Sequence, residues 1–246
     1  MMTKTERINE LMEALMALQL PAMASSLEEV FRSPGFDDMD KIDMLERIIE
    51  PEFEERSSMK FHNRLKRAHL LGGPQTMDKC IDSEDRVYLP SGITKTLSSM
   101  DFVNDGRNLC ILGPSDSGKS YLAKALGINA CLHYRTSYHH CEEFLESLVA
   151  LKQNDYIRYQ KKVRFYIKLD LLILDDFLLH TISDERELKV LFEILEKRSE
   201  LSRSTIVCSQ REPNSWASMI LNDEVSANAI LKRATKHYTV VIKPQN

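Results

Sequence analysis

The fold of this chain is decided by the stretch ILGPSDSGKS at residues 111–120. Its glycines, lysine and final serine satisfy the pattern G-x-x-x-x-G-K-[ST], which here follows a short apolar run and precedes a helical pattern. In that context the loop amides surround a phosphate group, Lys119 reaches the terminal phosphates and the Ser120 hydroxyl holds Mg²⁺. The sequence therefore predicts a site for a nucleoside triphosphate and Mg²⁺. The predicted nucleotide-binding residues are Gly113, Pro114, Ser115, Asp116, Ser117, Gly118, Lys119, Ser120 and Tyr121.

A second apolar run, LLILDD at residues 171–176, ends in two aspartates. A sheet built around a phosphate loop places such a strand end beside the metal. We expect Ser120 and Asp175 to hold Mg²⁺, with Asp175 acting through water, and Asp176 to orient or deprotonate the attacking water. Together the two motifs indicate a nucleotide site rather than a chance match to one pattern.

Polar residues also end the next apolar run, STIVCSQ at residues 204–210. At this strand end Ser209 or Gln210 could contact the terminal phosphate or the attacking water. A strand that simply ends in solvent fits the same spacing equally well.

Short apolar runs alternate with amphipathic segments from residue 109 to residue 242. This alternation predicts an α/β fold of the P-loop NTPase type, in which a mostly parallel sheet is sandwiched by helices. The interval between the two motifs holds one further strand and two helices. We therefore expect an inserted strand between the strand of the phosphate loop and the strand that ends in Asp175, an order typical of the P-loop class that activates water.

Helical periodicity dominates the start of the chain. Apolar residues recur at helical spacing up to Pro21, which we expect to end the first helix, and residues 41–50 predict a second helix. The sequence LLGGP at residues 70–74 then interrupts the pattern. Two domains are therefore predicted: a small all-helical module at residues 1–72, for DNA or partner interaction, and a P-loop ATPase domain at residues 73–246.

Composition supports a folded chain and excludes several classes of protein. Of the 246 residues, 43% are hydrophobic and 28% are charged, and the net charge of -4 excludes a uniformly basic coat for nucleic acid. Five scattered cysteines indicate neither a disulfide framework nor a zinc site. The acidic N-terminal segment excludes a signal peptide, and no apolar run reaches the roughly 18 residues of a membrane span. We therefore expect a cytoplasmic protein with no membrane partner.

Basic side chains concentrate in KQNDYIRYQKKVRFYIK at residues 152–168, with aromatic residues between them. Positive charge at this density could neutralise several phosphates of double-stranded DNA. The alternative is a solvated helix face whose aromatic residues lie in the core. A second basic segment, residues 56–67, could bind DNA or pair with its acidic neighbour at residues 37–55. The candidate DNA-binding residues are Lys152, Arg158, Lys161, Lys162, Arg164 and Lys168, with Arg64, Lys66 and Arg67.

The blocks GPSDSGKS, DLLILDDF and LFEILEKRSELSRSTIVCSQREPNSW resemble the IstB-like transposition helper ATPases, relatives of the DnaC-like helicase loaders within the AAA+ class. The resemblance covers most of the chain. It implies that ATP is the nucleotide, that Ser209 is the first sensor and that Arg233 reaches the nucleotide of a neighbouring subunit. The implied protein is a homo-oligomer when ATP-bound, which assembles on double-stranded DNA and recruits or stimulates a transposase. The implied catalytic residues are Lys119, Asp175, Asp176, Ser209 and Arg233.

Several positions depart from the family pattern. Asp116 replaces a glycine of the phosphate loop, where its charge should weaken phosphate binding unless it points outward. Leu178 replaces a glycine after the aspartate pair, and Lys232 replaces an aspartate. The chain stops at Asn246, before the tail whose arginine acts as a second sensor in the family. A DnaC-like helicase loader and, because of these departures, a non-hydrolysing nucleotide-binding scaffold are the alternatives.

Overall fold

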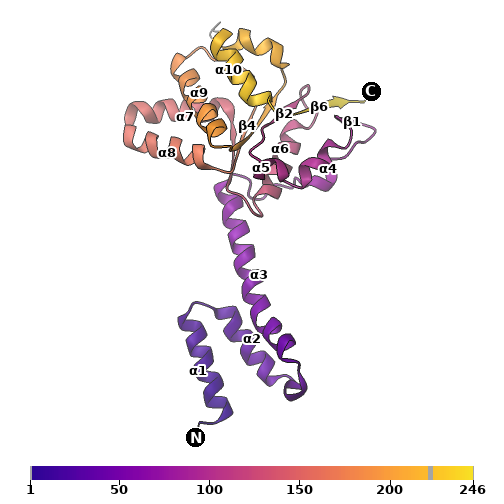
Figure 1. The fold of residues 1–246 in the computed structure, drawn as a ribbon, viewed down its shortest axis with the longest axis vertical. Helices are drawn as coiled ribbons and strands as arrows, with labels where there is room; N and C mark the ends of the chain where they lie inside the picture. Colours follow the sequence, from indigo (N-terminus) through magenta and orange to yellow (C-terminus); the bar gives the residue numbers. More distant parts are fainter. Residues whose placement is uncertain (1, 221–223, 246) are drawn as a thin grey trace. The chain divides into compact units, whose positions relative to one another are not determined.

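The structure is a computed structural model in which residues 2–220 and 224–245 are described. The chain divides into two compact units, Met1–Asn63 and Arg64–Asn246. Figure 1 shows the elements of both units, many of them with labels. No helix within the described residues has the length and the hydropathy needed to cross a membrane.

The division between the units falls inside a helix, earlier than the Gly72–Gly73 pair at which the sequence predicted it. The last turn of that helix belongs to the second unit because the Arg64 guanidinium donates hydrogen bonds to the carbonyl oxygens of Cys131 and Leu132, at 3.3 and 2.5 Å. These hydrogen bonds give Arg64 a structural role within the second unit. Its place among the candidate DNA-binding residues stays a prediction.

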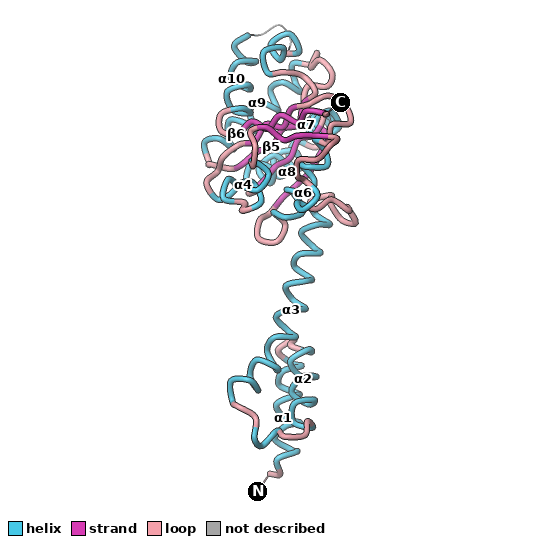
Figure 2. Tube along the Cα trace, turned by 90° about the vertical axis from the view of Figure 1, so that its right-hand side faces the viewer, coloured by secondary structure: helices cyan, strands magenta, loops and turns pink. Residues whose placement is uncertain are grey.

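The first unit is helical, as predicted (Figure 2). A capping box begins its first helix, because the Thr3 hydroxyl accepts from the Glu6 amide at 3.2 Å and the Glu6 carboxylate accepts from the Thr3 amide at 2.7 Å. The helices of this part of the chain are α1 at Lys4–Ala17, α2 at Pro21–Arg32 and α3 at Lys41–Arg67, with the 3-10 turn η1 at Phe36–Asp38.

Two helix boundaries in this region differ from the sequence prediction. Pro21 begins α2 rather than only ending the helix before it, because the first position of a helix needs no amide hydrogen and suits the fixed φ of proline. The helix expected to end at residue 50 instead runs through Pro51, which removes only one hydrogen bond of the helix ladder.

A buried carboxylate joins α2 to α3. Glu52 accepts hydrogen bonds from the amides of Ala22 and Met23, at 2.9 and 3.3 Å, at the start of α2. Burial raises the pKa of Glu52, but the hydrogen bond from Arg56 and the two amide bonds lower it overall. The side chain therefore acts as a capping group for α2 that comes from another helix.

The second unit is built on a six-stranded sheet in the order β1-β6-β2-β5-β4-β3. Only the pairing of β1 with β6 is antiparallel, so the predicted mostly parallel sheet is confirmed. The strands are β1 at Arg86–Leu89, β2 at Leu109–Leu112, β3 at Thr136–His140, β4 at Leu171–Asp175, β5 at Ser204–Ser209 and β6 at Tyr238–Pro244.

An inserted strand does separate β2 from β4, but it is not the strand that lies between the two motifs in the sequence. The inserted strand is β5, which follows β4 in the chain, and β3 lies at the edge of the sheet beyond β4. The sequence identified the strands from residue 109 onward but not β1, and it could not rank their positions across the sheet, because strand order is set by long-range pairing.

Helices cover both faces of the sheet, as predicted (Figure 1). On one face lies α6, where a Cβ added at Gly127 would come within 2.8 Å of the Ile173 side chain. The opposite face carries Leu172 and Leu174, which share a core with residues of α7, α8, α9 and α10. The helices are α4 at Ile93–Ser98, α5 at Asp101–Asn104, α6 at Lys119–Ala130, α7 at Cys141–Asn154, α8 at Tyr156–Lys168, α9 at Glu185–Glu200 and α10 at Glu224–Thr235.

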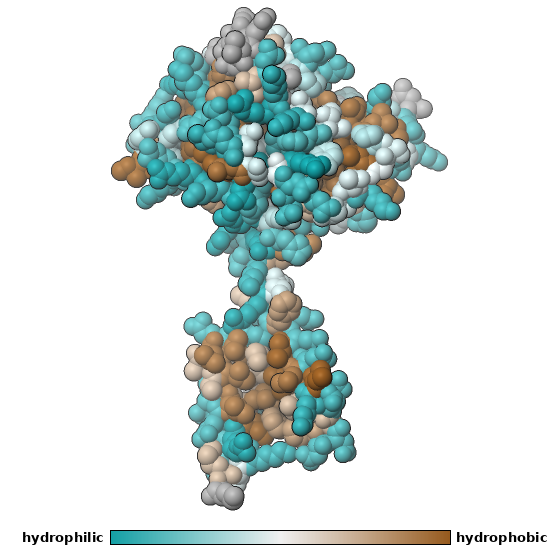
Figure 3. All heavy atoms as spheres, viewed as in Figure 1, coloured by the Kyte–Doolittle hydropathy of each residue, from teal (hydrophilic) through white to brown (hydrophobic). Residues whose placement is uncertain are grey.

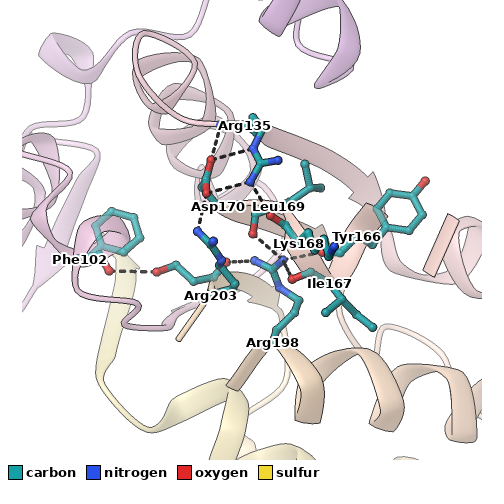
Figure 4. A network of polar contacts seen from close by, with 10 residues as sticks. Phe102, Arg135, Tyr166, Ile167, Lys168, Leu169, Asp170, Arg198 and Arg203 are labelled. Atoms are coloured by element: carbon teal, nitrogen blue, oxygen red, sulfur yellow. Dashed lines mark hydrogen bonds and ion pairs between the residues drawn. The ribbon is translucent and has the colours of Figure 1, made fainter. Parts of the chain in front are cut away.

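A fully buried arginine on α9 connects the end of α8 to the start of β5 (Figure 4). The Arg198 guanidinium donates to the carbonyl oxygens of Tyr166 and Leu169 at 2.6 and 2.9 Å. It also donates to the Ser204 carbonyl and, at 3.0 Å, to the Thr205 hydroxyl. Burial and the nearby Arg203 lower the pKa of Arg198 to about 9, so the group stays protonated at neutral pH.

We expect Arg198→Met to lower the free energy of unfolding of the second unit by at least about 3 kcal/mol. The reason is that several buried carbonyl oxygens lose their donor, at about 1–3 kcal/mol each before relaxation. Urea denaturation followed by the fluorescence of Trp216 measures this, because the chain has 1 tryptophan and it is buried in the second unit.

The matched control is Lys189→Met, which lies on the same helix and removes an exposed ion pair with Glu185 at 2.7 Å. This control should cost less than about 1 kcal/mol. Equal unfolding midpoints for the two variants would contradict the structural role assigned to Arg198.

Candidate functional site

The phosphate loop connects the end of β2 to the start of α6. Gly118 has a φ of +99°, and a Cβ there would lie 2.3 Å from an Arg86 guanidinium nitrogen. A Cβ at Gly113 would lie 2.6 Å from the carbonyl oxygen of Ile242. Position 113 therefore requires glycine because a backbone atom lies too close for a Cβ. Position 118 requires it because of its left-handed backbone, since the Arg86 side chain could move aside.

Two buried polar groups of the loop could donate to a bound anion. The Lys119 ammonium is buried and donates to the Pro114 carbonyl oxygen at 2.6 Å. The Ser117 hydroxyl is buried and has no hydrogen-bond partner among the described residues. Phosphate oxygens would accept from both groups, so these residues fit a triphosphate.

Asp116 adopts a φ of +59° and its side chain is exposed. A left-handed backbone explains why glycine is usual at this position of the family pattern, and aspartate tolerates it better than most residues do. The carboxylate thus meets solvent rather than filling the loop. Its charge nevertheless acts on the loop: burial lowers the pKa of Lys119 overall, and the Asp116 carboxylate opposes part of that shift.

Tyr121 lies on the first turn of α6 and lines a groove beside the phosphate loop. The groove measures about 370 Å³ and includes Pro74, Ile81 and Arg86 in its wall. The Tyr121 hydroxyl accepts a hydrogen bond from the Thr76 amide at 3.4 Å. The walls of the groove combine apolar, aromatic and charged side chains, next to the place where the sequence predicts the phosphates.

Asp175 ends β4 and is completely buried. Its carboxylate accepts hydrogen bonds from the Tyr138 hydroxyl and, at 3.0 Å, from the Asp176 amide. Burial and the nearby carboxylate raise the pKa of the Cys208 thiol, so the thiol stays protonated. The carboxylate is therefore held in one orientation by two donors.

The sheet brings the predicted site residues together. Burial lowers the pKa of Lys119, whereas the carboxylates of Asp175 and Asp176 raise it, because both negative charges lie near its ammonium group. The end of β5 lies between the ends of β2 and β4, so Ser209 belongs to the same row, where it is buried and accepts from the Arg211 amide at 3.2 Å.

The segment after Asp175 has an unusual backbone. Asp176 and Leu178 adopt φ values of +52° and +53°. This conformation explains the glycine expected at position 178, and a leucine there costs about 1–2 kcal/mol of backbone strain. Burial of the Leu178 side chain in the core offsets that strain. The Asp176 carboxylate lies 3.0 Å from His140 Nδ1.

Sequence reasoning missed the residues that contact Asp175 and the segment after it. Tyr138 and His140 come from β3, which pairs in parallel with β4. Phe177 packs against Trp216 with ring centroids 5.1 Å apart, and Trp216 also donates to the Arg211 carbonyl oxygen at 3.1 Å. The tryptophan at the end of the block that resembles the family was the one signal of this contact in the sequence.

Arg233 does not join the group around Lys119. It lies on α10, where its guanidinium donates to Glu196 of α9 at 3.1 Å and lies 5.0 Å from the centroid of the Phe192 ring. Lys232 beside it is exposed. Two positions of the sequence analysis lie outside the described residues. They are Asp223, near which a helix was expected to begin, and Asn246.

The candidate DNA-binding residues of 152–168 are all exposed. Lys152 ends α7 and the others lie on α8. Two of the aromatic residues of this segment, Tyr159 and Tyr166, are buried, as expected if they belong to the core. The other two, Tyr156 and Phe165, are exposed beside the basic side chains. The basic side chains therefore form one solvent-facing surface, which we call the α8 surface. Lys66 and Arg67 of the second basic segment are also exposed.

The family described as IstB-like ATP binding protein matches residues 13–245 of the chain. A protein named as an ATP-binding protein of insertion sequence IS232, from Bacillus thuringiensis subsp. berliner, is 30% identical over 229 residues, which cover 91% of this chain and 87% of that protein. The insertion sequence ATP-binding protein y4pL of Sinorhizobium fredii is 32% identical over 222 residues, which cover 90% and 88%.

Solved structures share the fold of the second unit. The DnaC helicase loader has a TM-score of 0.56 at 17% identity and covers 70% of this chain and 98% of its own. The replication initiator DnaA, bound to AMPPCP and single-stranded DNA, has a TM-score of 0.56 at 22% identity and covers 70% and 51%. At these identities the similarity shows a shared fold and nothing finer.

We expect Asp116→Asn to strengthen the binding of Mg²⁺-ATP about two- to fivefold at low salt. Asparagine tolerates the left-handed backbone, so the change removes one negative charge beside the loop without altering its conformation. Titration calorimetry at two salt concentrations measures the effect, which should shrink as salt screens the charge.

The matched control is Asp105→Asn, whose exposed carboxylate precedes β2 at the opposite end of that strand from the loop. It should leave the affinity unchanged. An equal gain in both variants, or none in Asp116→Asn, would show that the charge of Asp116 does not act on the nucleotide.

Proposed function

The chain belongs to the family of IstB-like ATP binding proteins, and we propose that it is an ATP-dependent helper that assembles on double-stranded DNA and recruits or stimulates a transposase. The observation that carries the proposal is that β2, which leads into the phosphate loop of Lys119, and β4, which ends in Asp175, are parallel and separated only by β5, so both end at the same edge of the sheet. The relatives are named for insertion sequences, which supports a transposase as the partner.

In the proposed site the loop amides and Lys119 bind the phosphates, and the hydroxyl of Ser120 with the carboxylate of Asp175 holds Mg²⁺. When bound, Mg²⁺ supplies charge neutralisation at the terminal phosphates. Asp176 would orient the attacking water and accept its proton, and Ser209 would contact the terminal phosphate. The groove lined by Tyr121 is the place for the base and ribose.

The α8 surface is the proposed contact with DNA. Its exposed lysines and arginines neutralise backbone phosphates, a mode of binding that carries no sequence information and weakens with salt. Arg233 is proposed to complete the nucleotide site of a neighbouring subunit. Its place on α10, apart from Lys119 of its own chain, supports action on another subunit.

The first unit is the proposed surface for protein partners. Figure 3 shows apolar side chains gathered on one face of this unit. Ile42, Leu45, Ile49 and Phe53 of α3 recur at helical spacing and are all at least 46% exposed. A helix with an unpartnered apolar stripe is typical of one that packs against another protein.

The two alternatives, a helicase loader and a non-hydrolysing scaffold, differ in the observations that support them. The fold shared with DnaC says nothing about a helicase as partner at 17% identity. A non-hydrolysing scaffold has support of its own, because Leu178 occupies a left-handed position and His140 engages the proposed catalytic carboxylate of Asp176.

Lys119→Ala should abolish assembly on DNA that depends on nucleotide, because the phosphates lose their buried cation. Sedimentation velocity of the protein with a duplex, with and without ATP, measures this. Lys95→Ala, which removes an exposed lysine of α4, should assemble like the parent chain. Undiminished assembly by Lys119→Ala would remove the nucleotide from the proposed mechanism.

A mixture of two inactive variants tests both hydrolysis and the role of Arg233. Lys119→Ala keeps Arg233 but loses its own site, whereas Arg233→Ala keeps its site but cannot complete that of a neighbour. We expect each alone to release phosphate from ATP at least about tenfold more slowly than the parent chain, and the mixture to recover part of the rate.

The Trp216 fluorescence of both variants should first show that they are folded. If the mixture then recovers none of the rate of phosphate release, a nucleotide site shared between subunits is contradicted. A parent chain that releases phosphate no faster than Lys119→Ala would establish the non-hydrolysing scaffold instead.

A further inference from the structure

A second groove, of about 700 Å³, lies at the β3 edge of the sheet and is distinct from the one beside the phosphate loop. Its walls come from α6, the end of β3, α7, α8 and the segment that follows α3. The volume is within the range of small-ligand sites, and none of the functions argued above uses it.

The floor of the groove is aromatic and uncharged. The rings of His139 and Tyr166 meet edge to face with centroids 5.2 Å apart, and Phe144 packs on Tyr166 at 4.8 Å. Burial lowers the pKa of His139 to about 4, so this histidine is neutral at pH 7. Tyr166 and Phe144 are also too deeply buried to offer a ring face to a planar ligand.

Two lysines bring positive charge to the groove. The Lys124 ammonium lies 4.9 Å from the centroid of the Tyr138 ring, and the Lys162 ammonium lies 5.2 Å from that of Tyr166. Neither lysine forms an ion pair within residues 2–220 and 224–245. Contacts with ring faces position both cations but leave their N–H donors available. Glu143 is the acidic residue of the lining.

We infer that this groove binds a phosphate group of the DNA backbone between Lys124 and Lys162. Unpaired ammonium groups around a neutral floor suit an anion, and the buried rings leave no face on which a base could stack. The inference rests on the proposed DNA binding and deepens it. Lys162 also belongs to the α8 surface, so a strand that follows α8 reaches the groove without a break.

The groove also adjoins the candidate ATP site. Tyr138 and His140 are part of its lining and contact the carboxylates of Asp175 and Asp176. A phosphate held in the groove would therefore lie beside the side chains that orient both carboxylates. This placement gives DNA a short physical route to the ATP site, through two residues of β3.

The imidazole NMR signals of the full chain locate the bound phosphate directly. His69 and His140 are exposed in the lining of the groove, whereas His180 and His237 lie outside it. We expect a duplex of arbitrary sequence to shift the signals of His69 and His140 at micromolar concentrations and to leave those of His180 and His237 in place. Inorganic phosphate should need at least about a hundredfold higher concentration.

Two double variants separate the groove from the rest of the α8 surface. Lys124→Gln with Lys162→Gln should remove the shifts of His69 and His140 and lower the salt dependence of duplex binding by about two ion equivalents. Lys161→Gln with Lys168→Gln removes the same charge from α8 outside the groove lining. It should weaken duplex binding but keep both histidine shifts.

Three results would overturn the inference. Duplex binding that leaves His69 and His140 unshifted, or shifts them equally in both double variants, places the DNA elsewhere and leaves the proposed DNA binding intact. Shifts caused by inorganic phosphate but not by duplex make the groove a site for free phosphate. If the chain binds no duplex under any condition, both this inference and the DNA contact of the proposed function are wrong.

Discussion

The candidate site depends on the parallel pairing of β2, β5 and β4. The register places Leu112 beside Ser209 and Leu174 beside Val207, so the carboxyl ends of the three strands form one row. A slip of one residue would turn every side chain of a strand to the opposite face of the sheet. The phosphate loop, Ser209 and Asp175 therefore meet only because the apolar residues of these strands determine the register.

A buried polar framework surrounds this row. Arg198 holds the end of α8, and with it the base of the α8 surface, to the start of β5. The Tyr138 hydroxyl, from the neighbouring strand β3, donates to the carboxylate of Asp175. In each case a strong donor satisfies an acceptor that would otherwise be buried alone, so the same contacts that stabilise the fold also orient the site.

Part of the backbone strain lies at the same place. Of the seven non-glycine residues with left-handed φ values in the described part of the chain, three are Asp116, Asp176 and Leu178. Strained residues persist where the surrounding structure over-determines their conformation, and such residues cluster at functional sites. Here Asp176 is held by His140 and its own amide bond to Asp175, and Leu178 is held by the core. The family pattern with glycine would relax this corner.

Local patterns in the sequence determined the phosphate loop, the aspartate pair, each strand from 109 to 242 and the helical nature of the first unit, because these features depend on neighbours in the chain. They did not determine that Pro21 begins a helix, that β3 takes the edge of the sheet, or that Arg64 and Arg198 satisfy buried carbonyl oxygens. Nor did they show the groove between Lys124 and Lys162. Only the tertiary structure decided these features, because strand order and long side-chain contacts arise from pairing between residues far apart in the chain, which no local period encodes.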